Sequence, residues 1–584
     1  TDSKEIIEKA LEKDSLLPTN PSVPSVQPDT NPSDAEQKET SPSEKEKSQK
    51  QEETTSNKLN TEENNMETSE SSMQEDSQKQ TNSIDTALNN ISKNEVLTTE
   101  KTVIYNNTMP PKESYTWKEN YDNFLGNVDG TGTFVISDYI GTNPDIRVPH
   151  AIRSRAVKFG RTFLTNIAAR GARSFATDAT WWFANGGSAW HNDLSFVFEN
   201  APNLESVDLS NLNLFTITSF NNAFRNCQNL KSVKLNPNLS AVTDMHAMFV
   251  GCVNLVDVDL NNLYAPLLED ASDMFAGCFS LTNFKGTAVN TEKLKNTHGL
   301  FYNAISLKTV DLTGWNFSQV TDTGFMFGCS TVSIENNGTN GKPMQLESII
   351  GLENANFNNV DTMSSMFQNT PNLQYVPVET WKAHIVKNLS WMFFKSGITK
   401  FDISQTDWWL LNVDTMESMF TYSKVNEVRF GQAGSNPWKV SNMINMFYDT
   451  PNLKYVDTEK WRIDHLSSTK RMFQNSGIEK IDLSTWNPIQ TNIDMSYMFT
   501  GAAKLREVDM RGFTNLDSQT TTNLLGTGQA ANPIMLIVQD SSGNTNFLNR
   551  DFVKESGRSV YSEFPKLVAN GGKFEDGSNE LSYI

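Results

Sequence analysis

A phenylalanine recurs about every 26 residues between Phe198 and Phe499, and this period constrains the fold more than any other feature of the chain. The repeated positions are Phe198, Phe224, Phe249, Phe275, Phe301, Phe327, Phe367, Phe393, Phe420, Phe447, Phe473 and Phe499. Neighbouring positions are almost evenly spaced, except for one long spacing between Phe327 and Phe367. A unit this short cannot bury its own apolar side, so each unit must stack on the next. The sequence therefore predicts a solenoid.

Each repeat combines a strand pattern with a Met-Phe pattern. In residues 229–252 the alternating apolar residues of a short strand are Leu230, Val233 and Leu235. The residues that follow with the spacing of one helix side are Met245, Met248 and Phe249. We expect Thr243 or Asp244 to cap this helical turn, and Asn226 or Asn369 to adopt the left-handed conformation that closes it. Stacked units would then form a parallel β-sheet on one side and short helical segments on the other.

The first part of the chain has a different composition. Residues 1–100 contain no Phe, Trp or Tyr and are rich in Ser, Thr, Glu, Lys, Gln and Asn. Such a segment buries too little apolar surface to offset the entropy of ordering, so we predict a disordered acidic spacer over residues 1–102. We further predict an N-terminal cap over 103–197, a solenoid of about 12 repeats over 198–540 and a linker toward a further module over 541–584. Within the solenoid, Ile534–Val538 is expected to be the closing strand.

Charge and hydropathy exclude several classes of partner. The chain has a net charge of −20 and no basic stripe that could neutralise phosphates, so we expect no nucleic acid partner. No run of 18 apolar residues occurs, so we expect no membrane span in this chain. The first residue is Thr1, which is compatible with a mature secreted form and equally with removal of a signal peptide by other means.

The four cysteines share one repeat position just after the phenylalanine. They are Cys227, Cys252, Cys278 and Cys329. We expect small buried side chains there, because other repeats place Thr370 or Ser396 at the same position. A strained disulfide between neighbouring coils is the less favoured alternative.

Catalysis has little support in the sequence. The six histidines form no metal or triad pattern, so we expect no catalytic residue, metal or cofactor. His246 and His298 share a repeat position, but they lie two coils apart, at about 10 Å, which is too far to share a metal. Solvated helix positions are the simpler explanation for both.

The position after the central strand residue alternates in charge. Its first occupants are Asp208, Lys234, Asp259, Lys285 and Asp311. Stacking would place them about 5 Å apart as a ladder of ion pairs. Later in the chain Asp457, Asp482 and Asp509 follow one another with no cation between them, so a basic ligand or a cation could bind there. The alternative, which we favour, is that these carboxylates cap turns and remain solvated.

A tryptophan column accompanies the later carboxylates. Its members are Trp315, Trp381, Trp461 and Trp486, and earlier coils place Leu212, Leu263 and Val289 there. The column is therefore first a packing position. Any exposed indole surface would add an aromatic strip that stacks on sugars or on partner side chains. The candidate ligand-binding residues are Trp461, Trp486, Asp457, Asp482 and Asp509, with the loop 336–341 inside the long spacing as a second candidate.

The repeat resembles a known family. The pattern N-L-x-x-V-D-L followed by V-T-D-M-x-x-M-F-x-x-C is similar to that of the BspA-like leucine-rich-repeat surface proteins of bacteria, in their 26-residue form. The stretch Gly132–Ala151 resembles the atypical first coil of that family, and Ala569–Gly572 resembles the junction to a small β module.

The resemblance implies a leucine-rich-repeat-like solenoid that lies outside the cell, secreted or attached to the cell wall. It also implies an adhesin that binds a host matrix or mucus protein, or a glycan. The alternative is homotypic aggregation through another copy on a neighbouring cell. An enzyme acting on polysaccharides is a remote alternative, because it needs paired carboxylates in a cleft, whereas repeats supply rows.

Overall fold

The computed structural model describes residues 123–178, 181–182, 192–331, 342–434, 436–513, 519–526, 534–537 and 560–561. The predicted spacer 1–102, the loop 336–341 and all of the predicted linker 541–584 except two residues lie outside them.

The described N-terminal cap combines a small sheet with one helix. Its strands, in sheet order, are β1 (Phe124–Val128), β2 (Phe134–Tyr139), β5 (Arg155–Phe159) and β4 (Ala151–Ile152). The helix α3 (Arg161–Ala169) buries Phe163, Leu164 and Ile167. Its Phe163 ring lies 5.3 Å from the ring of Phe159 and 6.2 Å from that of Phe175. These aromatic contacts cover the open end of the first coils with apolar surface.

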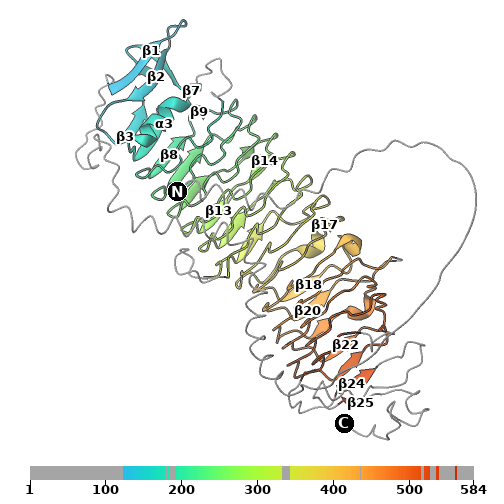
Figure 1. The fold of residues 1–584 in the computed structure, drawn as a ribbon. Helices are drawn as coiled ribbons and strands as arrows, with labels where there is room; N and C mark the ends of the chain where they lie inside the picture. The colour runs from blue at the N-terminus through green and yellow to red at the C-terminus, as the bar shows by residue number, and fades with distance from the viewer. Residues whose placement is uncertain are drawn as a thin grey trace, which may run out of the picture. The chain divides into compact units, whose positions relative to one another are not determined.

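A ladder of parallel strands forms one side of the solenoid (Figure 1). Its strands are β3 (Asp145–Val148), β6 (Ser174–Thr177), β8 (Ser206–Leu209), β10 (Ser232–Leu235), β11 (Asp257–Asp259), β13 (Asn283–Lys285), β15 (Thr309–Asp311), β16 (Ser348–Ile350), β18 (Lys400–Asp402), β20 (Glu427–Arg429), β21 (Tyr455–Val456), β22 (Lys480–Asp482), β23 (Glu507–Asp509), β24 (Ile534–Ile537) and β25 (Val560–Tyr561). Equivalent repeat positions pair in register, as Val207, Val233 and Val258 do. The predicted parallel strands on this side are thus confirmed, and in the described part of the chain they form four successive hydrogen-bonded sheets of five, three, three and four strands. The strand β24 is not the last one, because β25 pairs with it.

Two further ladders tie the coils together. The second contains the short strands β7 (Trp181–Trp182), β9 (Leu212–Asn213), β12 (Leu263–Tyr264), β14 (Ala288–Asn290), β17 (Lys382–Ala383) and β19 (Asp407–Trp408). The third is a column of single bridges that runs from Asp193 to Thr520. It passes from Asp322 directly to Thr362, so the long spacing does not interrupt the stack.

The repeated phenylalanines form the core of the solenoid. All twelve are at most 1% exposed. From Phe198 to Phe499 their rings stack with centroids 5.2 to 5.8 Å apart and planes 2° to 17° from parallel. The methionines beside them, such as Met248 and Met419, are buried as well. The predicted apolar spine is confirmed.

The side opposite the sheet consists of turns rather than of the helical segments that we expected. The N–H groups of Met245, Ala247 and Phe249 donate to carbonyls of the next coil at 2.8 to 2.9 Å, whereas those of Met248 and Val250 donate three residues back. Among the described residues, α3 is the one α-helix, and η3 (Val378–Thr380), η4 (Leu410–Asn412) and η5 (Thr458–Lys460) are short 3-10 helices.

Left-handed residues convert the expected helix into turns. In every repeat from Phe198 to Phe499 the residue two positions before the phenylalanine has a φ between 52° and 62°. Most repeats have a second left-handed residue two positions after it, including Asn226 and Asn369, as predicted. A left-handed residue breaks the helix and frees alternate N–H groups, which then bond to the neighbouring coil.

The four cysteines are buried thiols rather than disulfide partners, as predicted. Each thiol donates to a backbone carbonyl, for example Cys227 to Phe198 at 2.9 Å and Cys252 to Phe224 at 3.0 Å. Burial raises the pKa of Cys227 to about 12, so the thiol stays protonated and unreactive.

Candidate functional site

Two columns of side chains flank the central apolar residue of each coil on the side of the first ladder, including the coil of Tyr375, which forms no strand there. The leading column, one residue before the centre, is Ser206, Ser232, Asp257, Asn283, Thr309, Ser348, Tyr375, Lys400, Glu427, Tyr455, Lys480 and Glu507. The trailing column, one residue after it, is Asp208, Lys234, Asp259, Lys285, Asp311, Ile350, Pro377, Asp402, Arg429, Asp457, Asp482 and Asp509. Alternation along a strand places both columns on the outer side of the sheet.

The predicted charge ladder has the expected register but does not form ion pairs. Lys234 pairs in the sheet with Asp208 on one side and Asp259 on the other. The described residues include no ion-pair partner for Lys234. Instead Asp208 and Asp259 accept the N–H of the residue two positions later, at 3.0 and 3.1 Å. The carboxylates of Asp208 and Asp259 therefore cap turns instead of forming the predicted ion pairs.

Asp457 is a buried structural residue and not part of the surface. It is 0% exposed and accepts the backbone N–H groups of Phe430 at 3.0 Å and Gly431 at 2.8 Å. It also accepts the indole N–H of Trp461 at 2.9 Å. The adjacent coil thus turns around this carboxylate, which corrects the expectation that Asp457 faces a ligand.

The other two predicted carboxylates differ from each other. Asp509 is 4% exposed and pairs with Arg511, whose Nε lies 3.0 Å from Oδ1. The acidic run therefore has a cation beside it, contrary to our expectation. The sequence interpretation missed Arg511 because it considered only the strand positions. Asp482 remains half-buried at the surface and accepts the N–H of Ser484 at 2.9 Å.

Trp461 and Trp486 belong to the core. Both are 0% exposed, and their rings stack with centroids 5.8 Å apart. The N–H of Trp486 donates to the carbonyl of Thr458 at 3.1 Å, as that of Trp381 does to Leu352 at 2.8 Å. The column is the packing position that the earlier leucines suggested, and these two indoles offer no surface to a ligand.

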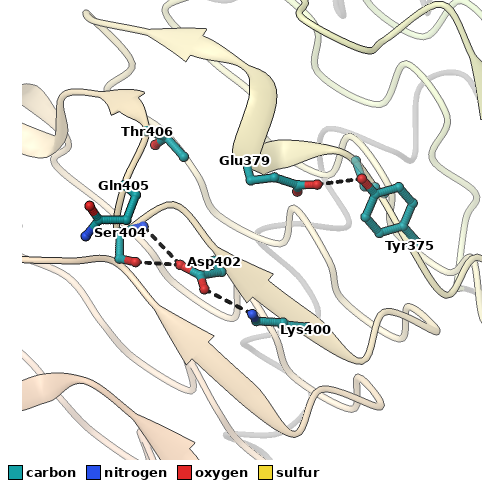
Figure 2. A pocket seen from close by; sticks show the side chains of 8 residues that line it. Tyr375, Glu379, Lys400, Asp402, Ser404, Gln405 and Thr406 are labelled. Carbon is teal, nitrogen blue, oxygen red and sulfur yellow. Dashed lines mark hydrogen bonds and ion pairs between the residues drawn. The ribbon is translucent and has the colours of Figure 1, made fainter.

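A shallow pocket of about 310 Å³ lies on the outer side of the sheet in the second half of the solenoid (Figure 2). It is lined by Tyr375, Val376, Glu379, Lys400, Asp402, Ser404, Gln405 and Thr406. The first three come from one coil, which ends in η3, and the others come from β18 and the turn after it. The tyrosine ring is 64% exposed, so the pocket has an open aromatic wall.

Polar contacts within the coils fix the walls of this pocket. The Tyr375 hydroxyl donates to Glu379 Oε1 at 2.5 Å. On the other wall Asp402 accepts the N–H of Ser404 at 3.1 Å and its hydroxyl at 2.7 Å, and pairs with Lys400 Nζ at 3.1 Å. Figure 2 shows the two groups facing each other from adjacent coils. The site is therefore organised before any ligand arrives.

The same contacts set the protonation states. The hydrogen bond to Glu379, together with burial and the carboxylate charge, raises the pKa of Tyr375 to about 12. Burial raises the pKa of Asp402, but its bonds to Ser404 and Lys400 outweigh burial and hold that pKa below its usual value. At neutral pH Tyr375 is thus a neutral donor and Asp402 an ionised acceptor.

An exposed indole extends the same two coils. Trp409, just after β19, is 56% exposed and stacks on His384 with ring centroids 3.9 Å apart and planes 13° from parallel. His384 Nε2 lies 3.0 Å from Asp407 Oδ1. Ile385 is 40% exposed and follows His384 along the chain. The coils that form the pocket therefore also carry an aromatic platform with one free face.

Sequence reasoning missed both of these features. The adjacent residues Trp408 and Trp409 indicate the platform. Neighbouring residues of a strand point to opposite sides, so only one of the two indoles can face the core. Tyr375 and Glu379 belong to the motif P-N-L-x-Y-V-x-x-E-x-W, which starts at Pro371 and again at Pro451. That motif returns only after three coils, so a search at the period of a single coil does not find it.

The described residues contain no group of three or more His, Cys, Asp or Glu side chains that could hold a metal ion. His246 and His298 are half-buried on turns rather than solvated on helices. Their Nδ1 atoms lie 2.8 Å from Ser272 Oγ and 3.3 Å from Asp322 Oδ1. No described helix is long and apolar enough to cross a membrane.

Two solved structures of leucine-rich-repeat proteins are similar to this chain. One is a leucine-rich repeat protein from Bacteroides ovatus ATCC 8483, with 12% identity and a TM-score of 0.36 over 77% of this chain and 100% of that one. The other is a leucine rich cell surface protein from Faecalibacterium prausnitzii A2-165, with 11% identity and a TM-score of 0.22 over 76% and 96%. A comparison with curated proteins finds no match.

A family model matches the repeats themselves. The model described as "Mycoplasma protein of unknown function, DUF285" matches residues 192–309, 218–341, 341–436 and 432–513. These overlapping matches cover more than half of the chain and coincide with the stacked coils. The chain therefore belongs to the DUF285 family.

Proposed function

We propose that the solenoid is an adhesive module of the bacterial cell surface that binds an extracellular host protein or glycan through the outer side of its second half. The observation that carries this proposal is the pair of exposed aromatic side chains on two successive coils. Tyr375 is 64% exposed and lines the preorganised polar pocket, and Trp409 on the next coil is 56% exposed. Exposed aromatic rings framed by satisfied polar groups are typical of recognition surfaces.

The resemblance of the repeat to bacterial surface proteins supports the same proposal. The acidic balance of the chain, with a net charge of −20, also favours partners that are neutral or basic. A binding surface is thus expected to act outside the cell, where the resemblance places such proteins.

The polar groups of the pocket support binding rather than hydrolysis. A glycoside hydrolase needs a protonated carboxylic acid opposite a second carboxylate. In this pocket Lys400 and Ser404 hold Asp402 ionised, and Glu379 already accepts the Tyr375 hydroxyl. These groups are arranged to orient a bound group and not to transfer a proton to it.

A binding experiment tests this proposal. The full chain is applied to immobilised glycans and extracellular matrix proteins, together with the Tyr375→Ala and Trp409→Ala variants. We expect saturable binding without cleavage products, and weaker binding by both variants. The matched control is Val289→Ala, which removes a side chain that is 66% exposed in the first half of the solenoid. Equal binding by all four proteins, or cleavage of a ligand, would contradict the proposal, and self-association in sedimentation would favour homotypic aggregation.

A further inference from the structure

Three coils of the second half are duplicated. The segment Pro371–Trp381 reads PNLQYVPVETW, and the segment Pro451–Trp461 reads PNLKYVDTEKW. The leading column follows the same three-coil period, with the order Tyr375, Lys400, Glu427, Tyr455, Lys480 and Glu507. The first half of the solenoid has no tyrosine in its leading column among the described coils.

Both copies build the same local structure around the tyrosine. The hydroxyl of Tyr375 donates to Glu379 at 2.5 Å, and that of Tyr455 donates to Glu459 at 2.9 Å. Each glutamate lies in a 3-10 helix, η3 or η5, which ends at a buried tryptophan. We call Tyr375 with Glu379 the first tyrosine site, and Tyr455 with Glu459 the second tyrosine site.

The second tyrosine site is occupied by a side chain of the protein itself. The guanidinium carbon of Arg429 lies 4.5 Å from the centroid of the Tyr455 ring. Arg429 is the trailing residue of the coil before Tyr455, and it also forms an ion pair with Glu427. Stacking of a guanidinium on an aromatic face, with a carboxylate beside it, is a favourable arrangement for this weakly hydrated cation.

Among the described residues, the first tyrosine site has the same tyrosine–glutamate pair without the cation, and Ser348 stands there in the position that Glu427 has beside the second tyrosine site. The trailing residue of the coil before Tyr375 is Ile350, which carries no charge. The Tyr375 ring is 64% exposed, whereas the Tyr455 ring is half-buried. Glu379 accepts the tyrosine hydroxyl, and the charge of Glu353 acts on the same ring from the preceding coil.

The lysines near both sites do not oppose a bound cation strongly. Lys400 Nζ pairs with Asp402 at 3.1 Å, and Lys480 Nζ pairs with Glu507 at 2.5 Å. Their charges are therefore compensated locally in both copies. Lys400 and Lys480 occupy equivalent positions in the leading column, and the second tyrosine site holds Arg429 beside Lys480 with Glu427 as the ion-pair partner of the arginine.

We propose that the first tyrosine site binds the guanidinium group of an arginine side chain on a partner protein, as the second tyrosine site holds Arg429. The arginine stacks on the Tyr375 ring from the side of the preceding coil, between Glu353 and Glu379. The pocket of Figure 2 lies between the coil of Tyr375 and the following coil and remains available to neighbouring residues of the partner. Arginine is preferred over lysine, because a planar guanidinium covers the ring and bonds to a carboxylate at once. This inference rests on the proposed binding function and names its chemistry.

Peptide titrations test the assignment. A labelled peptide of alternating Gly and Arg, and matched peptides with Lys or Gln in place of Arg, are titrated with the full chain in a fluorescence anisotropy assay. We expect the wild-type protein to bind one Arg peptide per chain. Its affinity for the Lys peptide should be at least tenfold lower, and its affinity for the Gln peptide at least a hundredfold lower. Equal binding of the three peptides would overturn the assignment.

Two exchange variants use the duplication as an internal control. Ile350→Arg supplies the first tyrosine site with its own guanidinium, so peptide binding should fall at least tenfold. Arg429→Ile opens the second tyrosine site, so the chain should bind two peptides instead of one. Both side chains are at the surface, and unchanged thermal unfolding would verify that folding is intact. If Ile350→Arg does not fold, Tyr375→Leu serves in its place, and it should lower the affinity for the Arg peptide by the same amount.

The outcomes separate this inference from the proposed function. Wild-type affinity in both Ile350→Arg and Tyr375→Leu, or a single bound peptide in Arg429→Ile, would overturn the arginine site. If binding to the immobilised ligands depends on Tyr375 while the Arg peptide does not bind, the proposed function stands and the arginine assignment is rejected. If the Arg peptide binds and no immobilised ligand does, the arginine assignment stands and the proposed function is rejected.

Discussion

The two halves of the solenoid share one core but present different outer surfaces. In the first half, Phe224 and Phe249 stack at 5.3 Å, and in the second half Phe420 and Phe447 stack at 5.4 Å. The leading column, by contrast, changes from small polar residues such as Ser232 and Thr309 to Tyr375 and Tyr455 and their charged neighbours. The inward positions are fixed by packing, so variation is tolerated only outside. We therefore expect the functional difference between the two halves to lie in the outer columns.

The trailing column shows that one residue type serves two purposes at one repeat position. Asp208 in the first half caps an exposed turn through the N–H of Ser210 at 3.0 Å. Asp457 in the second half is fully buried and accepts three N–H groups. The difference arises from the neighbouring coil, which wraps around Asp457 and supplies the donors.

The largest expected effect tests whether the core is equivalent in the two halves. Phe249→Ala and Phe420→Ala each remove a fully buried ring from the stack, so each should lower the free energy of unfolding by about 3–5 kcal/mol. Chemical denaturation followed by circular dichroism measures both. A loss below about 1 kcal/mol in one half would show that the stack does not stabilise both halves alike.

The next effect separates the two aspartates. Asp457→Ala leaves two backbone N–H groups and an indole N–H without their acceptor, so it should cost about 2–4 kcal/mol. Asp208→Ala loses one solvated turn contact and should cost about 0.5–1 kcal/mol. The two variants are compared by the same denaturation experiment. Equal costs would mean that the buried contacts of Asp457 are replaced by water.

A smaller effect concerns binding alone. Tyr375→Ser gives the second half the leading residue of the first, and it should weaken a bound partner by about 1–2 kcal/mol while stability changes by less than about 0.5 kcal/mol. Affinity and thermal unfolding are measured on the same preparation. Ser232→Tyr, the reverse exchange, should gain no binding, because the first half lacks the glutamate four residues later.

The smallest effect concerns the predicted carboxylate that remains at the surface. Asp482→Asn keeps the shape and removes the charge, so it should weaken a basic partner by less than about 1 kcal/mol, and the difference should fade at high salt. Asp208→Asn in the first half is the control and should leave binding unchanged. Affinities at low and high ionic strength measure both. A loss that is independent of salt would point to a direct hydrogen bond instead.

The architecture could be predicted because the inward phenylalanine column repeats without change. The regular period of the phenylalanines set the register of Val207 and Val233, and the single small residue after each phenylalanine indicated buried cysteines. The turns could not be predicted, because apolar residues at i, i+3 and i+4 occur both in a helix and in these turns. The deciding feature is a left-handed residue such as Ala247 or Ser365, and neither alanine nor serine favours the left-handed conformation, so the sequence does not predict it.

The site was harder to predict, because burial separates residues that look alike. Trp461 and Trp409 are both tryptophans of the second half, but one is 0% and the other 56% exposed. That difference depends on which side of a short strand each residue occupies, and the loose coils around Trp408 obscure the register. Asp509 looked unpaired because its cation, Arg511, lies in the turn and not in the column.

The bonds between coils have a mechanical consequence. On the turn side, backbone N–H groups such as that of Met245 donate to the next coil, and on the sheet side the N–H of Lys231 donates to the preceding coil, so these bonds run along the stacking direction. A pull between the ends of the solenoid acts along them and detaches coils singly, beginning at an end. Each coil of about 26 residues then releases roughly 90 Å of extended chain. In the proposed adhesive role, this stepwise release would lower the load on a cell held in flowing liquid while the remaining coils stay folded.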